Sequence, residues 1–147
     1  NQYGLNSAAR IEVDADEFQR LAASEGEEEM RLALSLYQDD YLTECLYEDW
    51  PAAERRRLRD LYLCTAERLA RRALKARAWD ETVSLCEAIL ARDNCWEAAY
   101  RLLMRAHAAA GNRALVQAGY QRCLAALRDG LGLEPSPATR ALLQKLS

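Results

Sequence analysis

Few side chains in this sequence are of the types that catalyse reactions or bind metals, and their spacing assembles no recognisable site. The one histidine, His107, stands between alanines on a predicted helix, where histidine is more often packed than catalytic. No nucleophile-elbow, zinc-protease or P-loop motif occurs. The Gly-Leu-Gly run at 130–132 follows no strand, and the acids from Glu25 to Glu29 fit a solvated helix start. We therefore expect no enzyme activity, no catalytic residue, no metal and no cofactor.

The cysteines are odd in number, and no two have the Cys-x-x-Cys spacing of a zinc or redox motif. They are Cys45, Cys64, Cys86, Cys95 and Cys123. Three of them, Cys64, Cys86 and Cys123, fall on apolar helical stripes, where cysteine packs as a small hydrophobe. This usage is typical of a reduced intracellular protein, so we predict a cytoplasmic location.

Charged residues spaced four apart are the sequence's clearest candidates for binding. Glu67, Arg71 and Lys75 form one set, and Arg101 and Arg105 form a second set at the same spacing. Residues four apart share a face of an α-helix, so each set predicts one stripe. One hypothesis is that the stripes line a basic groove that receives an acidic segment or an anionic ligand. The other, which we favour slightly, is that the C-terminal helix, or the acidic first helix of the same chain, fills that groove.

A second candidate surface is the aromatic loop at residues 38–50, whose contact candidates are Tyr41, Tyr47 and Trp50. A loop rich in tyrosine and tryptophan either packs against the core or is presented to a partner. We favour packing, because the rings would then cover the end of a helical stack, as a terminal repeat requires.

The elements that must position these residues repeat along the chain. A shift of 34 residues places Leu69 on Leu103 and Cys86 on Tyr120. Each copy is predicted as a helix, a tight turn and a helix, which is the tetratricopeptide (TPR) spacing. The first helix of each pair lines the concave face of such a stack, and both charged stripes fall on these first helices. We predict an all-α, TPR-like right-handed superhelix of antiparallel helix pairs, with about seven helices and no strand.

Capping signals place the first helices. Residues 1–10 are expected to be a linker or disordered, and residues 11–147 a single domain. Asp14 is the predicted N-cap of the first helix, with Glu17 as its capping-box partner. A second helix is expected to begin at Glu27. Pro51 is expected at the N1 position of a long helix that runs to about Ala76.

Further signals place the later helices. One is predicted to begin at Trp79, and the next to stop at Gly111 as a left-handed cap. The following helix has an inward stripe that includes Leu115 and is expected to break at Gly130 and Gly132. The serine at 136, between two prolines, is a plausible N-cap of the last helix.

The net charge of −3 is distributed unevenly. Residues 1–50 carry a net charge of −10, residues 51–77 of +6 and residues 78–147 of +1. Such asymmetry indicates either an acidic lobe that faces a basic helix or a nucleic-acid surface, and we favour the first interpretation. No apolar run approaches the roughly 20 residues of a membrane span, and no signal segment is recognisable. We interpret the sequence as a fragment of a longer chain without membrane contact.

Motifs at several places in the chain resemble a known family. They are Tyr41-Leu42, Leu46-Tyr47-Glu48-Asp49-Trp50, Glu54-Arg55-Arg56-Arg57-Leu58, Tyr100-Arg101-Leu102-Leu103-Met104-Arg105-Ala106, Gly111 with Tyr120, and Leu131-Gly132-Leu133-Glu134-Pro135-Ser136-Pro137. Together they resemble the bacterial transcriptional activator domain over about residues 11–146. This is the TPR-like module of antibiotic-regulatory-protein-type and ATPase-containing transcriptional regulators. The chain departs from the pattern at Asp39, at Arg77 and at Asn94, which affects single turns.

The resemblance implies a non-catalytic regulatory domain that mediates oligomerisation, signal sensing or contact with the transcription machinery. Its expected partners are proteins: a second copy in a homodimer, a neighbouring DNA-binding or ATPase domain, or the transcription machinery. No strand or wing resembles a winged helix, so we expect DNA binding only in the full-length protein. The alternatives are a generic TPR adaptor unrelated to transcription, and direct nucleic-acid binding by the basic helix, which would weaken steeply with salt.

Overall fold

The computed structural model describes residues 14–38 and 51–147, and every regular element within these residues is an α-helix. The chain divides into two compact units, Asn1–Ala66 and Glu67–Ser147, which are described separately below. The all-α prediction is confirmed, and the helix pairs match a TPR-like fold. The predicted linker at 1–10 and the aromatic loop candidates Tyr41, Tyr47 and Trp50 lie outside the described residues.

The first unit is built on buried aromatic rings. Its helices are residues 14–23, α2 (Glu27–Gln38) and the first part of α4 (Ala52–Lys75). The ring centroids of Phe18 and Tyr37 lie 5.2 Å apart, and those of Tyr37 and Tyr62 lie 4.7 Å apart. All three side chains are buried, together with Met30 and Leu58. Offset and tilted ring pairs of this kind stabilise a core beyond the area that they bury.

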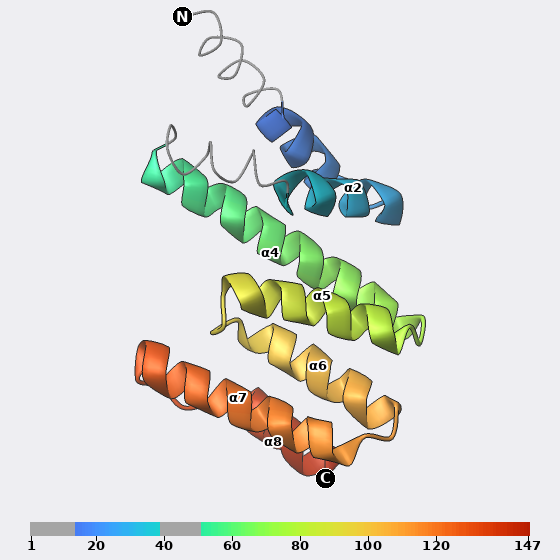
Figure 1. The fold of residues 1–147 in the computed structure, drawn as a ribbon, viewed down its shortest axis with the longest axis vertical. Coiled ribbons are helices and arrows are strands. Elements are labelled where there is room, and N and C mark those ends of the chain that lie inside the picture. Colours follow the sequence, from blue (N-terminus) through green and yellow to red (C-terminus); the bar gives the residue numbers. More distant parts are fainter. Residues whose placement is uncertain (1–13, 39–50) are drawn as a thin grey trace, which may run out of the picture. The chain divides into compact units, whose positions relative to one another are not determined.

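The second unit contains the C-terminal part of α4 and four further helices, shown in Figure 1. These are α5 (Trp79–Arg92), α6 (Glu97–Ala109), α7 (Arg113–Leu131) and α8 (Pro137–Leu146). Helix α6 packs against α5, α7 and α8. Leu102, Leu103 and Met104 of α6 are buried, and Met104 joins Val116 and Leu142 in a cluster shared by three helices. Helix α6 is therefore the central helix of this unit.

Two turns in the second unit have the same backbone, 34 residues apart. After α4, the N–H groups of Ala76, Arg77 and Ala78 donate to the carbonyls of Arg72, Leu74 and Ala73. After α6, the corresponding N–H groups at 110, 111 and 112 donate to the carbonyls at 106, 108 and 107. Arg77 has φ 60° and Gly111 has φ 81°, so each turn contains one left-handed residue. Both are Schellman-type helix ends, which supports the predicted repeat.

Some predicted helix boundaries are wrong. Asp14 is already helical, so it is not the N-cap of the first helix. Pro51 precedes α4, and its carbonyl accepts from the N–H of Arg55, so it occupies the N-cap position rather than N1. Helix α7 continues through Gly130 to Leu131, and its C-cap residue is Gly132, whose φ is 64°. A Cβ at Gly130 would lie 2.9 Å from Sγ of Cys95, so glycine permits this close approach.

Two predictions of burial are also wrong. Cys64 is exposed, whereas Cys86 and Cys123 are buried as predicted. Thr65 takes the inward position on α4, with its hydroxyl donating to the carbonyl of Leu61 at 2.7 Å, and this bond makes a buried hydroxyl tolerable. Leu115 is 42% exposed, because the inward face of α7 begins at the next residue.

Candidate functional site

Glu67 joins its own helix to the start of α6. One carboxylate oxygen accepts from Nε and Nη2 of Arg71, at 3.1 Å and 2.9 Å. The other accepts from the indole N–H of Trp96 at 2.8 Å. Only 20% of the Glu67 side-chain surface is exposed, and Trp96 is the N-cap residue of α6. Glu67 is thus occupied by contacts within the fold.

Arg101 has a similar role one repeat later. Its Nη1 lies 3.3 Å from Oε2 of Glu97 and 3.0 Å from the hydroxyl of Thr139, near the start of α8. Glu97 also accepts from the backbone N–H and the hydroxyl of Ser136 and from the hydroxyl of Thr139. Ser136 is the predicted N-cap, yet its side chain makes no capping bond. The carboxylate of Glu97 instead satisfies the positive end of α8.

The contacts of Glu97 govern its protonation. Burial by itself would raise the pKa of this carboxyl above its ordinary value. The hydrogen bonds from Ser136 and Thr139, with the positive charge of Arg101, outweigh burial and lower the pKa. Glu97 is therefore ionised at neutral pH, which is the form that its donors require.

The five predicted stripe residues divide into two kinds. Glu67 and Arg101, 34 residues apart, are only 20% and 25% exposed, and each bonds near the start of the next helix but one. We call these the inner positions. Arg71, Lys75 and Arg105 are exposed, and we call these the outer positions. Arg71 pairs with Glu67, whereas neither Lys75 nor Arg105 is bonded or ion-paired to a residue that the structure describes. Among the described residues the outer positions therefore comprise two unpaired cations, Lys75 and Arg105, and a third cation, Arg71, that is exposed but paired with Glu67.

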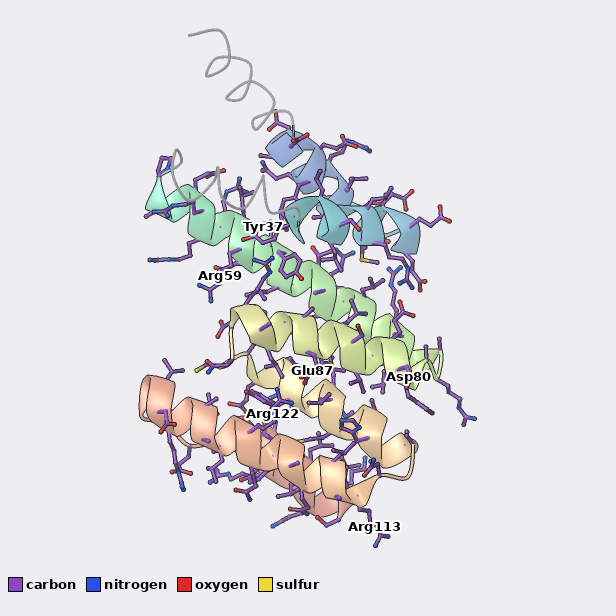
Figure 2. The ribbon with its side chains drawn as sticks, viewed as in Figure 1. Tyr37, Arg59, Asp80, Glu87, Arg113 and Arg122 are labelled. Carbon is purple, nitrogen blue, oxygen red and sulfur yellow. The ribbon has the colours of Figure 1, made fainter. Side chains whose placement is uncertain are left out.

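The structure also contains an open hollow that the sequence did not indicate. It is lined by α6, by α7 and by the turn that follows α5. Its volume is about 540 Å³, and its lining residues are Asn94, Tyr100, Arg122, Ala125, Ala126, Asp129 and Gly130. The guanidinium of Arg122 lies 5.9 Å from the centre of the Tyr100 ring and pairs with Glu87 at 2.8 Å. Figure 2 labels Glu87 and Arg122 close together, on α5 and α7. The hollow is lined by charged groups of both signs, and its arginine, Arg122, is already paired with Glu87.

Burial shifts the pKa of several side chains of the second unit. Burial raises the pKa of both Cys86 and Cys123 to about 12, so both remain thiols at neutral pH. Burial lowers the pKa of His107, which keeps its ring neutral. Burial raises the pKa of Tyr100, and its hydroxyl donates to the carbonyl of Asn94 at 2.7 Å. In residues 14–38 and 51–147 no group of three or more His, Cys, Asp or Glu side chains could hold a metal ion.

Helix pairs repeated at a 34-residue period are typical of the helical-repeat class of domains. Residues 8–147 match the family model of the bacterial transcriptional activator domain, and the chain belongs to this family. The predicted resemblance is thereby confirmed. No curated protein matches the chain at a significant level. No helix of the described segments has the length and apolar character needed to cross a membrane.

Proposed function

We propose that residues 11–147 act as one non-catalytic protein-binding domain of a cytoplasmic transcriptional regulator. The proposed ligand is an acidic segment of a partner protein, and the proposed contacts are the outer positions Arg71, Lys75 and Arg105. The observation that carries this proposal is the division of the stripes. The inner positions are occupied by contacts within the fold, whereas the outer positions leave exposed cations on α4 and α6. Exposed cations on rigid helices attract acidic peptides through long-range charge.

The test is the affinity for a fluorescein-labelled poly-glutamate peptide, measured by anisotropy at low salt. Arg71→Glu with Arg105→Glu should weaken binding at least about tenfold, which corresponds to about 1.4 kcal/mol. Helicity should not change, because Arg71 is about half exposed in its pair with Glu67 and such exposed charges contribute little to stability. Wild-type affinity in this variant would contradict the proposal.

A matched control separates the stripe from overall charge. Arg56→Glu with Arg113→Glu makes the same change in net charge at two exposed positions outside the stripes. Figure 2 shows Arg113 at the start of α7, pointing away from the helices. This control should keep most of the affinity. Equal losses in both double variants would show that net charge alone governs binding.

The family favours a regulatory role over that of a generic TPR adaptor. The two are distinguished by the rest of the gene, where a winged-helix or ATPase segment beside this domain decides for regulation. A role in pairing two copies is tested by sedimentation of the isolated chain. A concentration-dependent dimer would assign self-association to the domain, and a strict monomer that binds its neighbouring domain would assign sensing.

A further inference from the structure

Arg77 has a backbone conformation that arginine rarely adopts. Its φ is 60°, in the left-handed region, where a Cβ crowds the following carbonyl. Arg77 is the only non-glycine residue with positive φ in residues 14–38 and 51–147. The equivalent residue one repeat later is Gly111, in a turn with the same three backbone hydrogen bonds. Glycine therefore satisfies this turn without strain, and the turn itself does not call for arginine.

The Arg77 side chain does not repay this strain by packing. The residue is exposed, and its guanidinium is neither bonded nor ion-paired to any residue in the described ranges. Its charge is favourable at the negative end of α4. The last turn of α4 already contains two cations for that role, Arg72 and Lys75. Residues held in such sparsely populated backbone conformations cluster at functional sites, ligand clamps among them.

Arg77 lies close in the sequence to two of the outer positions. It follows Lys75 by two residues and Arg71 by six, directly after the end of α4. We propose that Arg77 extends the outer positions beyond the end of the helix and contacts a carboxylate of the bound acidic segment. This inference rests on the binding function proposed above. It adds a fourth cation and sets one end of the site at the turn between α4 and α5.

An acidic peptide fits this end of the site better than a nucleic acid. Asp80 and Glu81 begin α5 three and four residues after Arg77, and Glu67 lies among the cations of α4. A phosphate backbone carries closely spaced negative charges and would approach these acids unfavourably. A peptide can place its acidic side chains singly against each cation.

Two measurements on Arg77→Gly test the inference, one of binding and one of stability. Affinity for the labelled poly-glutamate peptide should fall about two- to fivefold, as expected for one exposed ion pair. The urea midpoint should rise, because glycine removes the left-handed strain. Arg77→Lys, which keeps both the charge and the strain, should retain wild-type affinity and the wild-type midpoint. Removal of one side chain should thus make the chain more stable and bind more weakly.

Results that differ from these predictions show which of the two proposals is wrong, the role of Arg77 or the binding function. If Arg77→Gly binds with wild-type affinity while Arg71→Glu with Arg105→Glu binds weakly, the role of Arg77 is overturned. The proposed function then stands. Wild-type affinity of both variants would overturn both proposals. An equal loss in Arg77→Lys would show that charge is not the cause, and a lower midpoint in Arg77→Gly would remove the strain argument. Tighter binding of a labelled DNA duplex than of poly-glutamate, reduced by Arg77→Gly, would overturn the choice of an acidic peptide.

Discussion

The two repeats of the second unit have one backbone pattern and different side chains. In the first, Glu67 accepts a hydrogen bond from Trp96 at the start of α6, and the turn contains Arg77. In the second, Arg101 bonds to Thr139 near the start of α8, and the turn contains Gly111. In both repeats the inner position thus joins its helix to the start of the next helix but one, although its charge is reversed. We call this bond between two helices a junction. The two repeats therefore have a junction at the same position, made by side chains of opposite charge.

The second junction also recruits more groups than the first. Glu97 accepts hydrogen bonds from Arg101 and, at the start of α8, from Ser136 and Thr139. Glu67 accepts hydrogen bonds only from Trp96 and Arg71 among the described residues. Helix α8 has only ten residues, of which Thr139 and Leu142 are buried. A helix of this length is marginal without tertiary contacts, so its junction must contribute more to its stability.

The largest expected difference between the junctions is in stability. Glu97→Ala should lower the free energy of unfolding by about 2 kcal/mol, because it leaves several donors at the start of α8 without a charged acceptor. Glu67→Ala should lower it by about 1 kcal/mol, since it removes one part-buried hydrogen bond from Trp96 and one partly exposed ion pair with Arg71. Urea unfolding measures both losses, provided that the slope of the unfolding free energy against urea concentration is the same in the variants and the wild type. Equal losses would contradict the proposed asymmetry.

The same junction predicts a pH dependence. The folded-state pKa of Glu97 is lowered from its ordinary value of 4.5. Its contribution to stability is therefore complete above 4.5 and is lost as the pH falls through the folded-state pKa. The urea midpoint should fall less on acidification in Glu97→Gln than in the wild type. Parallel acid profiles of the two proteins would show that Glu97 does not carry this dependence.

The two turns should respond with opposite signs to changes at the left-handed residue. Gly111→Ala should cost about 1 kcal/mol, because alanine disfavours positive φ. Arg77→Gly should gain about 0.5 kcal/mol, since relief of strain exceeds the added freedom of the unfolded chain. Thermal unfolding of both variants measures the pair. Changes of the same sign would show that the two turns are not equivalent.

The smallest expected effect is that of the ion pair between Glu87 and Arg122, which joins α5 to α7. Both side chains are about half exposed, so a double-mutant cycle with Glu87→Gln and Arg122→Gln should give a coupling of about 0.5 kcal/mol. High salt should reduce this value. A coupling that salt leaves unchanged would show that the pair is shielded from solvent.

Local patterns predicted much of the fold, because caps and apolar spacing act over a few residues. The 34-residue period predicted both turns, and the Arg77 turn formed even without glycine. Local signals failed where packing overrides them. Gly130 does not break α7, since the helix continues to Leu131 and is capped by Gly132. On α4, Thr65 rather than Cys64 turns inward.

The junction at Glu97 was the main feature that the sequence did not predict. Its partners Ser136 and Thr139 lie 39 and 42 residues away, so no local pattern connects them. One signal was present, because the N3 position of α8 is Thr139, where a capping box has Glu or Gln. A helix start without its own acid needs a carboxylate from elsewhere. The stripe spacing did predict which residues share a face, but not which of them the fold would occupy.

The central claim is that the outer positions bind an acidic segment while the inner positions hold the fold together. Amide NMR spectra of the chain during titration with poly-glutamate test it most directly. The account predicts that shifts concentrate at residues 71–77 and around Arg105, with little change at Ser136 and Thr139. Shifts confined to the start of α8 or to residues 14–38, with residues 71–77 unaffected, would contradict it.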